Sequence, residues 1–145
     1  MLKDLIGSNI SIVMENTLSP DIAVDKMCEK LLASGAIKPS YIEAIKRLQN
    51  EIGPYYVVAP RIAMPHARPE DGVITEGLQL TVFKNGVDLG DKDNGNVYIA
   101  LTLAATGAEN HMNLIQSVAT FFQDEERIAK IINCNSVEEI IGYLS

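Results

Sequence analysis

The chain has only two histidines, and the first of them, His66, lies in the stretch APRIAMPHARPEDG, residues 59–72. Pro65 precedes this histidine and Pro69 follows it closely. Proline fixes its own φ and restricts the residue before it, so His66 is held on a stiff segment. A neutral imidazole is a good nucleophile near pH 7 and can accept a phosphoryl group and release it again. The residues alone also allow a plain hydrogen-bonded histidine in a turn.

The second histidine, His111, belongs to a late segment, ENHMNLIQSVATFFQDEE, for which a helix is expected over 109–123. It falls in the first turn, where free N–H groups and the positive end of the helix dipole favour a phosphate. If this turn faces His66, His111 can donate a hydrogen bond to phosphoryl oxygens. The alternative is an exposed residue at a helix start. Asn110 is either the N-cap, which is the simpler interpretation, or a further phosphoryl donor.

Charged residues surround His66 on both sides. A guanidinium from Arg61 or Arg68 would stabilise phosphoryl charge or contact an acidic partner, and the alternative for both is a solvated loop side chain. Glu70 and Asp71 would repel a phosphoryl group at close range, which favours a solvated turn for them.

The elements that must position these residues follow from hydrophobic periodicity and helix-end signals. The predicted helices span 19–35, 38–53 and 109–123, with shorter ones within 124–134 and 136–144. The predicted strands span 10–14, 55–59, 77–83 and 96–105, and KNGVDLGDKDNGN before the last strand is a predicted loop. Helices on either side of a strand-rich middle predict the α/β class, as a three-layer α/β/α sandwich with a mixed β-sheet.

Three expectations concern packing. The apolar run YYVVA at 55–59 is typical of a strand covered on both faces, with His66 following on a constrained surface segment. In the first long helix, Ser19 is the expected N-cap and Ile22 is expected near the buried face with Met27 and Leu31. In the late helix, the row at helical spacing is expected in the core: Met112, Ile115, Ala119 and Phe122.

Composition narrows the class of protein. The 145 residues fit one domain, 1–145, and the formal net charge of −7 argues against a nucleic-acid partner. The apolar stretches fall short of the roughly 18 residues of a membrane span, and no signal peptide is visible. Cys28 and Cys134 form no CxxC and are expected as packed thiols, which predicts a cytoplasmic protein. P-loop, dinucleotide-binding, serine-elbow and HExxH motifs do not occur.

The residues around His66 resemble a known signature. Glu51, Val58-Ala59 and residues 62–67 match, position by position, the active-site signature of the mannitol/fructose-type IIA domains of the bacterial sugar phosphotransferase system. The resemblance extends over the whole chain, including the second histidine at the start of a late helix. GPYYVVAP and PHARPEDGV are most similar to the ascorbate-type IIA group.

This resemblance implies a mannitol-type IIA-like fold and a phosphoryl relay. The phosphocarrier HPr delivers a phosphoryl group to His66, which passes it to a IIB component on a separate chain, and the membrane component IIC couples that transfer to sugar uptake. The protein is then a phosphotransferase with a phosphohistidine intermediate, without cofactor, nucleotide or metal. The resemblance also strengthens the role of His111 in stabilising the phosphoryl group.

Three alternatives stay open at this point. The first is a regulatory IIA-like phosphoacceptor without a role in transport. The second, from another class, is a metal-binding hydrolase that uses His66, His111 and either Asp91 or Asp93, since catalytic zinc sites often take two histidines and a carboxylate. The third is a pure interaction module, which would leave the stiff MPHARP segment unexplained.

Overall fold

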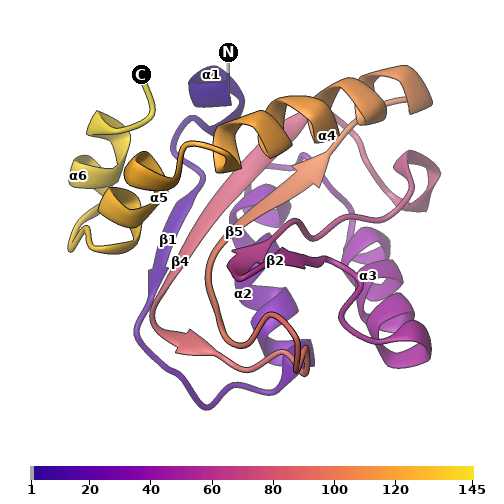
Figure 1. Ribbon diagram of the computed structural model, residues 1–145. Helices are drawn as coiled ribbons and strands as arrows, with labels where there is room; N and C mark the ends of the chain where they lie inside the picture. Colours follow the sequence, from indigo (N-terminus) through magenta and orange to yellow (C-terminus); the bar gives the residue numbers. More distant parts are fainter. Residues whose placement is uncertain (1) are drawn as a thin grey trace.

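The computed structural model describes residues 2–145 and has a five-stranded sheet at its centre (Figure 1). The strand order is β1-β4-β5-β3-β2. The strands are β1 (Ile10–Val13), β2 (Val57–Ala59), β3 (Arg61–Ala63), β4 (Gly77–Val87) and β5 (Val97–Ala104). The helices are α1 (Leu2–Ile6), α2 (Pro20–Ala33), α3 (Pro39–Ile52), the 3-10 turn η1 (Pro69–Asp71), α4 (Ala108–Phe122), α5 (Glu125–Ile132) and α6 (Val137–Gly142).

Helices cover both faces of the sheet, so the predicted three-layer α/β/α sandwich is confirmed (Figure 1). One apolar cluster lies between the sheet and helices α2 and α3, and the other between the sheet and helices α1, α4, α5 and α6. Strand β4 contributes to both, because successive side chains point to opposite faces: Val82 belongs to one cluster and Phe83 to the other.

The sheet is mixed, as expected. Strand β4 runs antiparallel to β5 and parallel to β1, whereas β3 runs parallel to β5 and antiparallel to β2. Because β3 and β5 point the same way, the residues after β3 emerge at the same end of the sheet as the residues after β5. The chain after β5 leads into α4. This topology brings His66 and the first turn of α4 together.

The observed strands differ from the predicted ones at β2, at β3 and at the end of β4. Residues 55–59 do not form a strand covered on both faces. Only residues 57–59 of this stretch form a strand, β2, which lies at the edge of the sheet and leaves Val58 51% exposed. Strand β3 was not predicted. It follows β2 after a turn at Pro60, and its first residue, Arg61, has a φ of 73°. Strand β4 also continues through Val87, into the predicted loop. These three-residue strands depend on pairing with other strands, β3 with β5 and β2 with β3, which no local pattern reveals.

Two helix faces also differ from the prediction. In α4, Met112 is 58% exposed and Ala119 is exposed, so the predicted core row is wrong apart from Phe122 and the partly buried Ile115. The row that is buried consists of Leu114, Val118, Phe121 and Phe122. Both rows have helical spacing and apolar members, so periodicity could not choose between them. In α2, Ser19 is the N-cap as predicted, but Ile22 is 48% exposed.

Candidate active site

The segment that carries His66 is hydrogen-bonded on both sides as it leaves β3. Met64 N–H donates to the Tyr56 carbonyl at 2.8 Å, on the β2 side. Leu103 N–H donates to the Pro65 carbonyl at 3.0 Å, on the β5 side. Met64 and Pro65 are buried, whereas His66 is only half-buried. The sheet therefore holds the backbone firmly and presents the histidine at its end.

The orientation of the imidazole leaves one nitrogen available. His66 Nδ1 lies 2.7 Å from the Met64 carbonyl oxygen. A carbonyl only accepts, so Nδ1 must carry the proton and donate it there. In the neutral ring Nε2 then keeps its lone pair. The local chain thus selects the tautomer in which Nε2 is the nucleophile.

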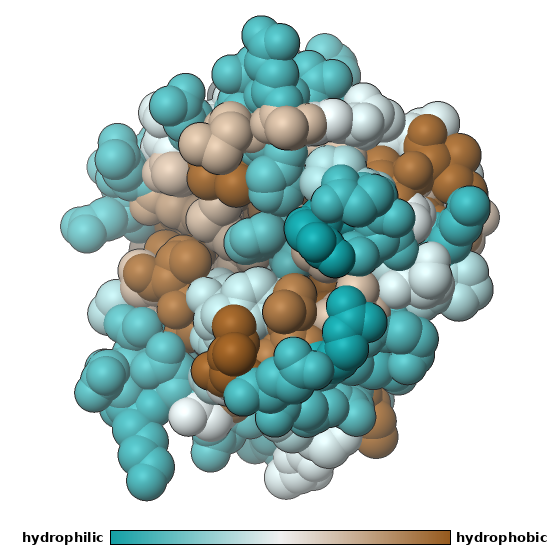
Figure 2. Space-filling model, turned by 90° about the vertical axis from the view of Figure 1, so that its right-hand side faces the viewer, coloured by the Kyte–Doolittle hydropathy of each residue, from teal (hydrophilic) through white to brown (hydrophobic). Residues whose placement is uncertain are grey.

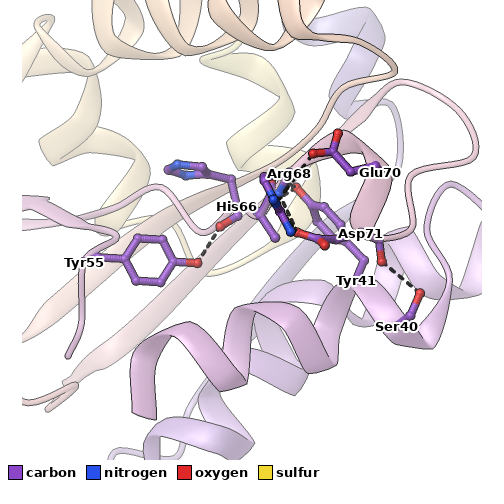
Figure 3. Close-up of polar contacts among 8 residues, drawn as sticks. Ser40, Tyr41, Tyr55, His66, Arg68, Glu70 and Asp71 are labelled. Atoms are coloured by element: carbon purple, nitrogen blue, oxygen red, sulfur yellow. Dashed lines mark hydrogen bonds and ion pairs between the residues drawn. The ribbon is translucent and has the colours of Figure 1, made fainter. Parts of the chain in front are cut away.

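Two tyrosine hydroxyls contact the backbone at His66 and Ala67, and neither contact could be predicted from the sequence. Tyr55 donates to the His66 carbonyl at 2.5 Å, and its ring meets the imidazole edge-on at a centroid distance of 5.8 Å (Figure 3). The Tyr41 hydroxyl, from α3, accepts from Ala67 N–H at 3.0 Å. In the sequence, Tyr41 is one residue of the predicted helix 38–53 and Tyr55 one of the predicted strand 55–59; only the tertiary fold brings them to His66.

His111 is the residue of α4 that meets His66. The two ring centroids are 5.4 Å apart, and His111 lies in the first turn of the helix, whose N-cap is Gly107. The Nδ1 atom of His111 is buried and has no hydrogen-bond partner within residues 2–145. Burial lowers the pKa of His111 from its ordinary value, and the nearby His66 lowers it further, while Glu70 acts in the opposite direction. A neutral imidazole with an unused buried nitrogen therefore stands beside the candidate nucleophile.

Arg68 lies on the same side of the molecule as His111. Its side chain is 71% exposed, and Nε lies 3.5 Å from carboxylate oxygens of both Glu70 and Asp71 (Figure 3). Arg68 N–H also donates to Asp71 Oδ2 at 3.0 Å. Arg68, Glu70, His111 and Met112 are among the residues that line an open pocket of about 590 Å³. The guanidinium is thus near the site and already engaged by two carboxylates.

Two of the predicted site residues are placed differently from the expectation. Asn110 is not the N-cap of α4, which is Gly107; its side-chain amide donates to Thr106 Oγ1 at 3.3 Å. Arg61 does not flank His66 in space. It pairs with Val97 at the beginning of β5, the end of the strand opposite to the site, because the chain between Arg61 and His66 is extended. It lines a separate pocket with residues that include Lys84 and Tyr98.

The ligands required by the metal hypothesis are not brought together. Asp91 caps a tight turn, accepting from the backbone N–H groups of Asp93 and Asn94. Asp91 and Asp93 line a pocket that does not include His111. Within residues 2–145, no group of three or more histidine, cysteine, aspartate or glutamate side chains is placed to hold a metal ion. The same part of the chain has no helix with the length and apolar character that crossing a membrane requires.

Comparison with known proteins agrees with this geometry. The chain is 33% identical to the ascorbate-specific PTS system EIIA component of Escherichia coli strain K12, over 99% of this chain and 94% of that protein. It is 32% identical to the component of the same description in Salmonella typhimurium, with the same coverage.

Solved structures of IIA proteins also resemble this chain over nearly its whole length. The mannitol-specific cryptic phosphotransferase enzyme IIA of Escherichia coli superposes with a TM-score of 0.87 at 31% identity, covering 98% of this chain and 96% of that one. The mannitol IIA of Escherichia coli, at 24% identity and a TM-score of 0.79, shares the fold over 95% and 96% of the two chains. The predicted mannitol-type IIA-like fold is therefore confirmed.

A family model described as phosphoenolpyruvate-dependent sugar phosphotransferase system, EIIA 2, matches residues 8–145, almost the whole chain. Members of this family are phosphoryl-carrying phosphotransferases of sugar uptake. The end of β3, the first turn of α4 and the half-buried His66 between them thus belong to a protein of the EIIA 2 family of the sugar phosphotransferase system.

Proposed function

We propose that His66 is the phosphoacceptor of this EIIA protein and that Nε2 is the atom that bonds to phosphorus. The observation that carries the proposal is the hydrogen bond between His66 Nδ1 and the Met64 carbonyl, which leaves Nε2 unprotonated beside His111. The donor is the phosphocarrier HPr and the acceptor is a IIB component, with residues 1–145 acting as one domain in the cytoplasm.

The transfer of the phosphoryl group requires no proton transfer. The lone pair of Nε2 attacks the phosphorus of the carrier's phosphohistidine, a new P–N bond forms, and the P–N bond to the carrier breaks. The electron pair of the broken bond returns to the carrier's nitrogen. If the carrier's ring enters with a proton on its other nitrogen, it leaves as a neutral imidazole. The His66 ring then carries the positive charge, which its Nδ1–H shares with the Met64 carbonyl.

The surroundings of Nε2 supply positioning and charge stabilisation, which is most of what phosphoryl transfer requires. We expect His111, whose ring lies 5.4 Å from that of His66, to donate a hydrogen bond to the phosphoryl oxygens, and the free N–H groups of the first turn of α4 to add positive potential. Arg68 can support this charge only by giving up part of its contact with Glu70 and Asp71. Asn110 is exposed near the same helix start and is the weaker candidate for a phosphoryl contact.

The sugar and the partner are proposed from relatives. The relatives described as ascorbate-specific cover nearly the full chain, so we assign the relay to uptake of ascorbate or a similar acidic sugar. A solved complex pairs the mannitol IIA of Escherichia coli with its phosphorylated IIB, and that IIA shares the present fold with a TM-score of 0.79 at 23% identity. We expect a IIB domain to approach His66 in this chain as well, with the membrane component IIC acting downstream of it.

The test is to incubate the protein with phosphorylated HPr and to map the acid-labile label. We expect one phosphoryl group, on Nε2 of His66, identified by nitrogen and phosphorus NMR. His66→Gln should remove the label and keep the fold, checked by circular dichroism, whereas Met112→Ala, next to the site, should be labelled normally. Undiminished label in His66→Gln, or label on Nδ1, would contradict the proposal.

A further inference from the structure

One of the two backbone hydrogen bonds expected between the His66 segment and Leu103 of β5 is not made directly. Strand β3 pairs with β5 so that Ala63 faces Ala100, and continuing this register places His66 opposite Leu103. In a parallel ladder, the residue facing His66 donates to the carbonyl before it and accepts from the N–H after it. Leu103 N–H does donate to the Pro65 carbonyl. The expected second bond, from Ala67 N–H to the Leu103 carbonyl, is replaced.

The hydroxyl of Tyr41 occupies the place of that second bond. Ala67 N–H donates to the Tyr41 hydroxyl at 3.0 Å, and the hydroxyl donates to the Leu103 carbonyl at 2.6 Å. One hydrogen bond of about 2.9 Å is thus extended into two that run through an inserted oxygen. The chain separates from β5 at this point, and His66 lies at the point of separation.

Tyr41 is well suited to hold a fixed spacing. Its side chain is fully buried, in the cluster between the sheet and helices α2 and α3, so the ring cannot withdraw. It belongs to the first turn of α3, and the neighbouring Ser40 donates to the Asp71 carbonyl, which ties η1 to the same helix. Helix α3 therefore sets the distance between the His66 segment and the sheet.

We propose that Tyr41 is a positioning residue for phosphoryl transfer: its hydroxyl, inserted between Ala67 and Leu103, holds His66 away from β5 and so sets where Nε2 meets the incoming phosphorus. This inference rests on the proposed function of His66. Without the hydroxyl, Ala67 N–H and the Leu103 carbonyl lose their shared partner and attract each other directly. That movement draws His66 toward the sheet and changes its relation to His111.

A buried tyrosine hydroxyl also stabilises a fold, so a matched control is needed. Tyr56 provides it, because it is equally buried and its hydroxyl donates to Gln49 Oε1 instead of the 65–67 segment. Tyr41→Phe and Tyr56→Phe each remove one oxygen and one buried hydrogen-bonding group. Both variants are expected to lose thermal stability, and only the Tyr41 variant is expected to affect His66.

The experiment has two independent readouts. Nitrogen NMR of the histidine rings reports the environment and tautomer of His66 without any partner. The kinetics of phosphorylation, with phosphorylated HPr and with the small donor phosphoramidate, report transfer. In Tyr41→Phe we expect shifted ring signals for His66, a kcat at least about tenfold lower, since small misplacements of reacting groups are costly, and an unchanged KM for HPr. Tyr56→Phe should match the wild type in all three.

Other outcomes would contradict either the positioning role of Tyr41 or the proposed function of His66. Wild-type ring signals and rates in Tyr41→Phe, or equal effects of both variants, would overturn the positioning role. If wild-type protein is not labelled at His66, the proposed function fails, while the ring signals still decide whether Tyr41 positions the histidine. Should Tyr41→Phe not fold, an ester in place of the Ala67 amide removes the N–H donor and leaves every side chain intact, with the same shift of the His66 signals expected.

Discussion

The chemistry of single residues in this site depends on which nitrogen of each imidazole is engaged. Nδ1 of His66 donates to the Met64 carbonyl, and the Met64 backbone is itself held by the bond from Met64 N–H to the Tyr56 carbonyl. Nδ1 of His111, in contrast, is buried without a partner in the described chain. The first nitrogen is thus engaged by the backbone, and the second is engaged by no described residue.

His111 should assist transfer without accepting the phosphoryl group. In His111→Ala we expect label still on His66 and slower onward transfer. A lost hydrogen bond to a charged group costs roughly 1.5–3 kcal/mol, so the rate should fall about ten- to a hundredfold. Met112→Ala is the control, because Met112 neighbours His111 and is largely exposed. Rates that are unchanged in His111→Ala would make His111 a surface residue without a role in transfer.

The lowered pKa of His111 predicts a pH dependence of stability. Burial and the neighbouring His66 keep the pKa of His111 in the folded protein below its ordinary value near 6.5. The unfolded chain therefore binds this proton more readily, and folding is opposed as pH falls through about 6.5 toward the folded pKa. When the pH is lowered from 7.5 to 5.5, the Tm of the wild type should fall more than the Tm of His111→Ala. A difference that is independent of pH would contradict the lowered pKa.

At the scale of elements, the contact between η1 and α3 should matter for the site. Gly72 ends η1 with a φ of 142°, and a Cβ there would lie 2.6 Å from Ser40 Oγ and 3.0 Å from Tyr41 N. Gly72→Ala must push η1 away from α3 and disturb the segment that follows His66. We expect lower stability and slower phosphorylation.

Gly35 offers a matched control for that substitution. It also has a positive φ, of 79°, but a Cβ there would meet nothing within 4 Å. Gly35→Ala should therefore cost only the conformational strain of about 1 kcal/mol and leave phosphorylation unchanged. Thermal unfolding and labelling rates of the two variants check this. Equal rates in both would show that the η1–α3 contact does not position His66.

The elements that could be predicted from sequence are those with long local patterns. Helices α2, α3 and α4 and strands β4 and β5 follow from periodicity, and Ser19 and Gly35 fall at the predicted ends of α2. Strand β3 could not be predicted, because its three residues are extended only through pairing with β5. The same reason hides Tyr41, whose hydroxyl acquires its partners from residues 26 and 62 positions away in the chain.

A further feature of α2 shows the same limit. The side-chain amide of Gln79, from β4, accepts from the N–H groups of Lys30 and Leu31 and donates to the Lys26 carbonyl. A polar side chain from the sheet thus bonds backbone groups within a helix. In the sequence, Gln79 is simply a polar residue within an alternating strand, and its burial beside α2 follows only from the packed fold.

At the scale of the whole molecule, the parallel pairing of β3 with β5 decides which residues can form a site. It places the end of β3 beside the start of α4 and leaves Arg61 at the opposite end. The face viewed in Figure 2, on the side of α3 and of the start of α4, shows separate apolar patches among polar side chains. Such a mixed surface suits partners that bind briefly and in turn.

The choice of IIB partner is the last property that this face should control. Because the protein is a phosphoryl carrier, we expect its sugar specificity to come from the partner that it recognises. Of the residues in the turn after His66, Ala67 is buried and cannot take part in recognition, whereas Arg68 and Glu70 are about 70% exposed. These two charges are therefore the candidates for selecting a IIB surface, since a mismatch of like charges costs several kcal/mol.

We expect phosphorylated protein to transfer fastest to a IIB domain of the ascorbate branch when offered ascorbate, mannitol, fructose and galactitol IIB domains. Exchanging the two charges, in Arg68→Glu with Glu70→Arg, should slow transfer to the preferred IIB far more than it slows labelling by phosphoramidate. Glu138→Arg is the control, because Glu138 is exposed on α6, across the sheet from α3. Fastest transfer to another branch would refute the ascorbate assignment and leave the His66 chemistry intact. Equal transfer to all four IIB domains would show that Arg68 and Glu70 carry no specificity.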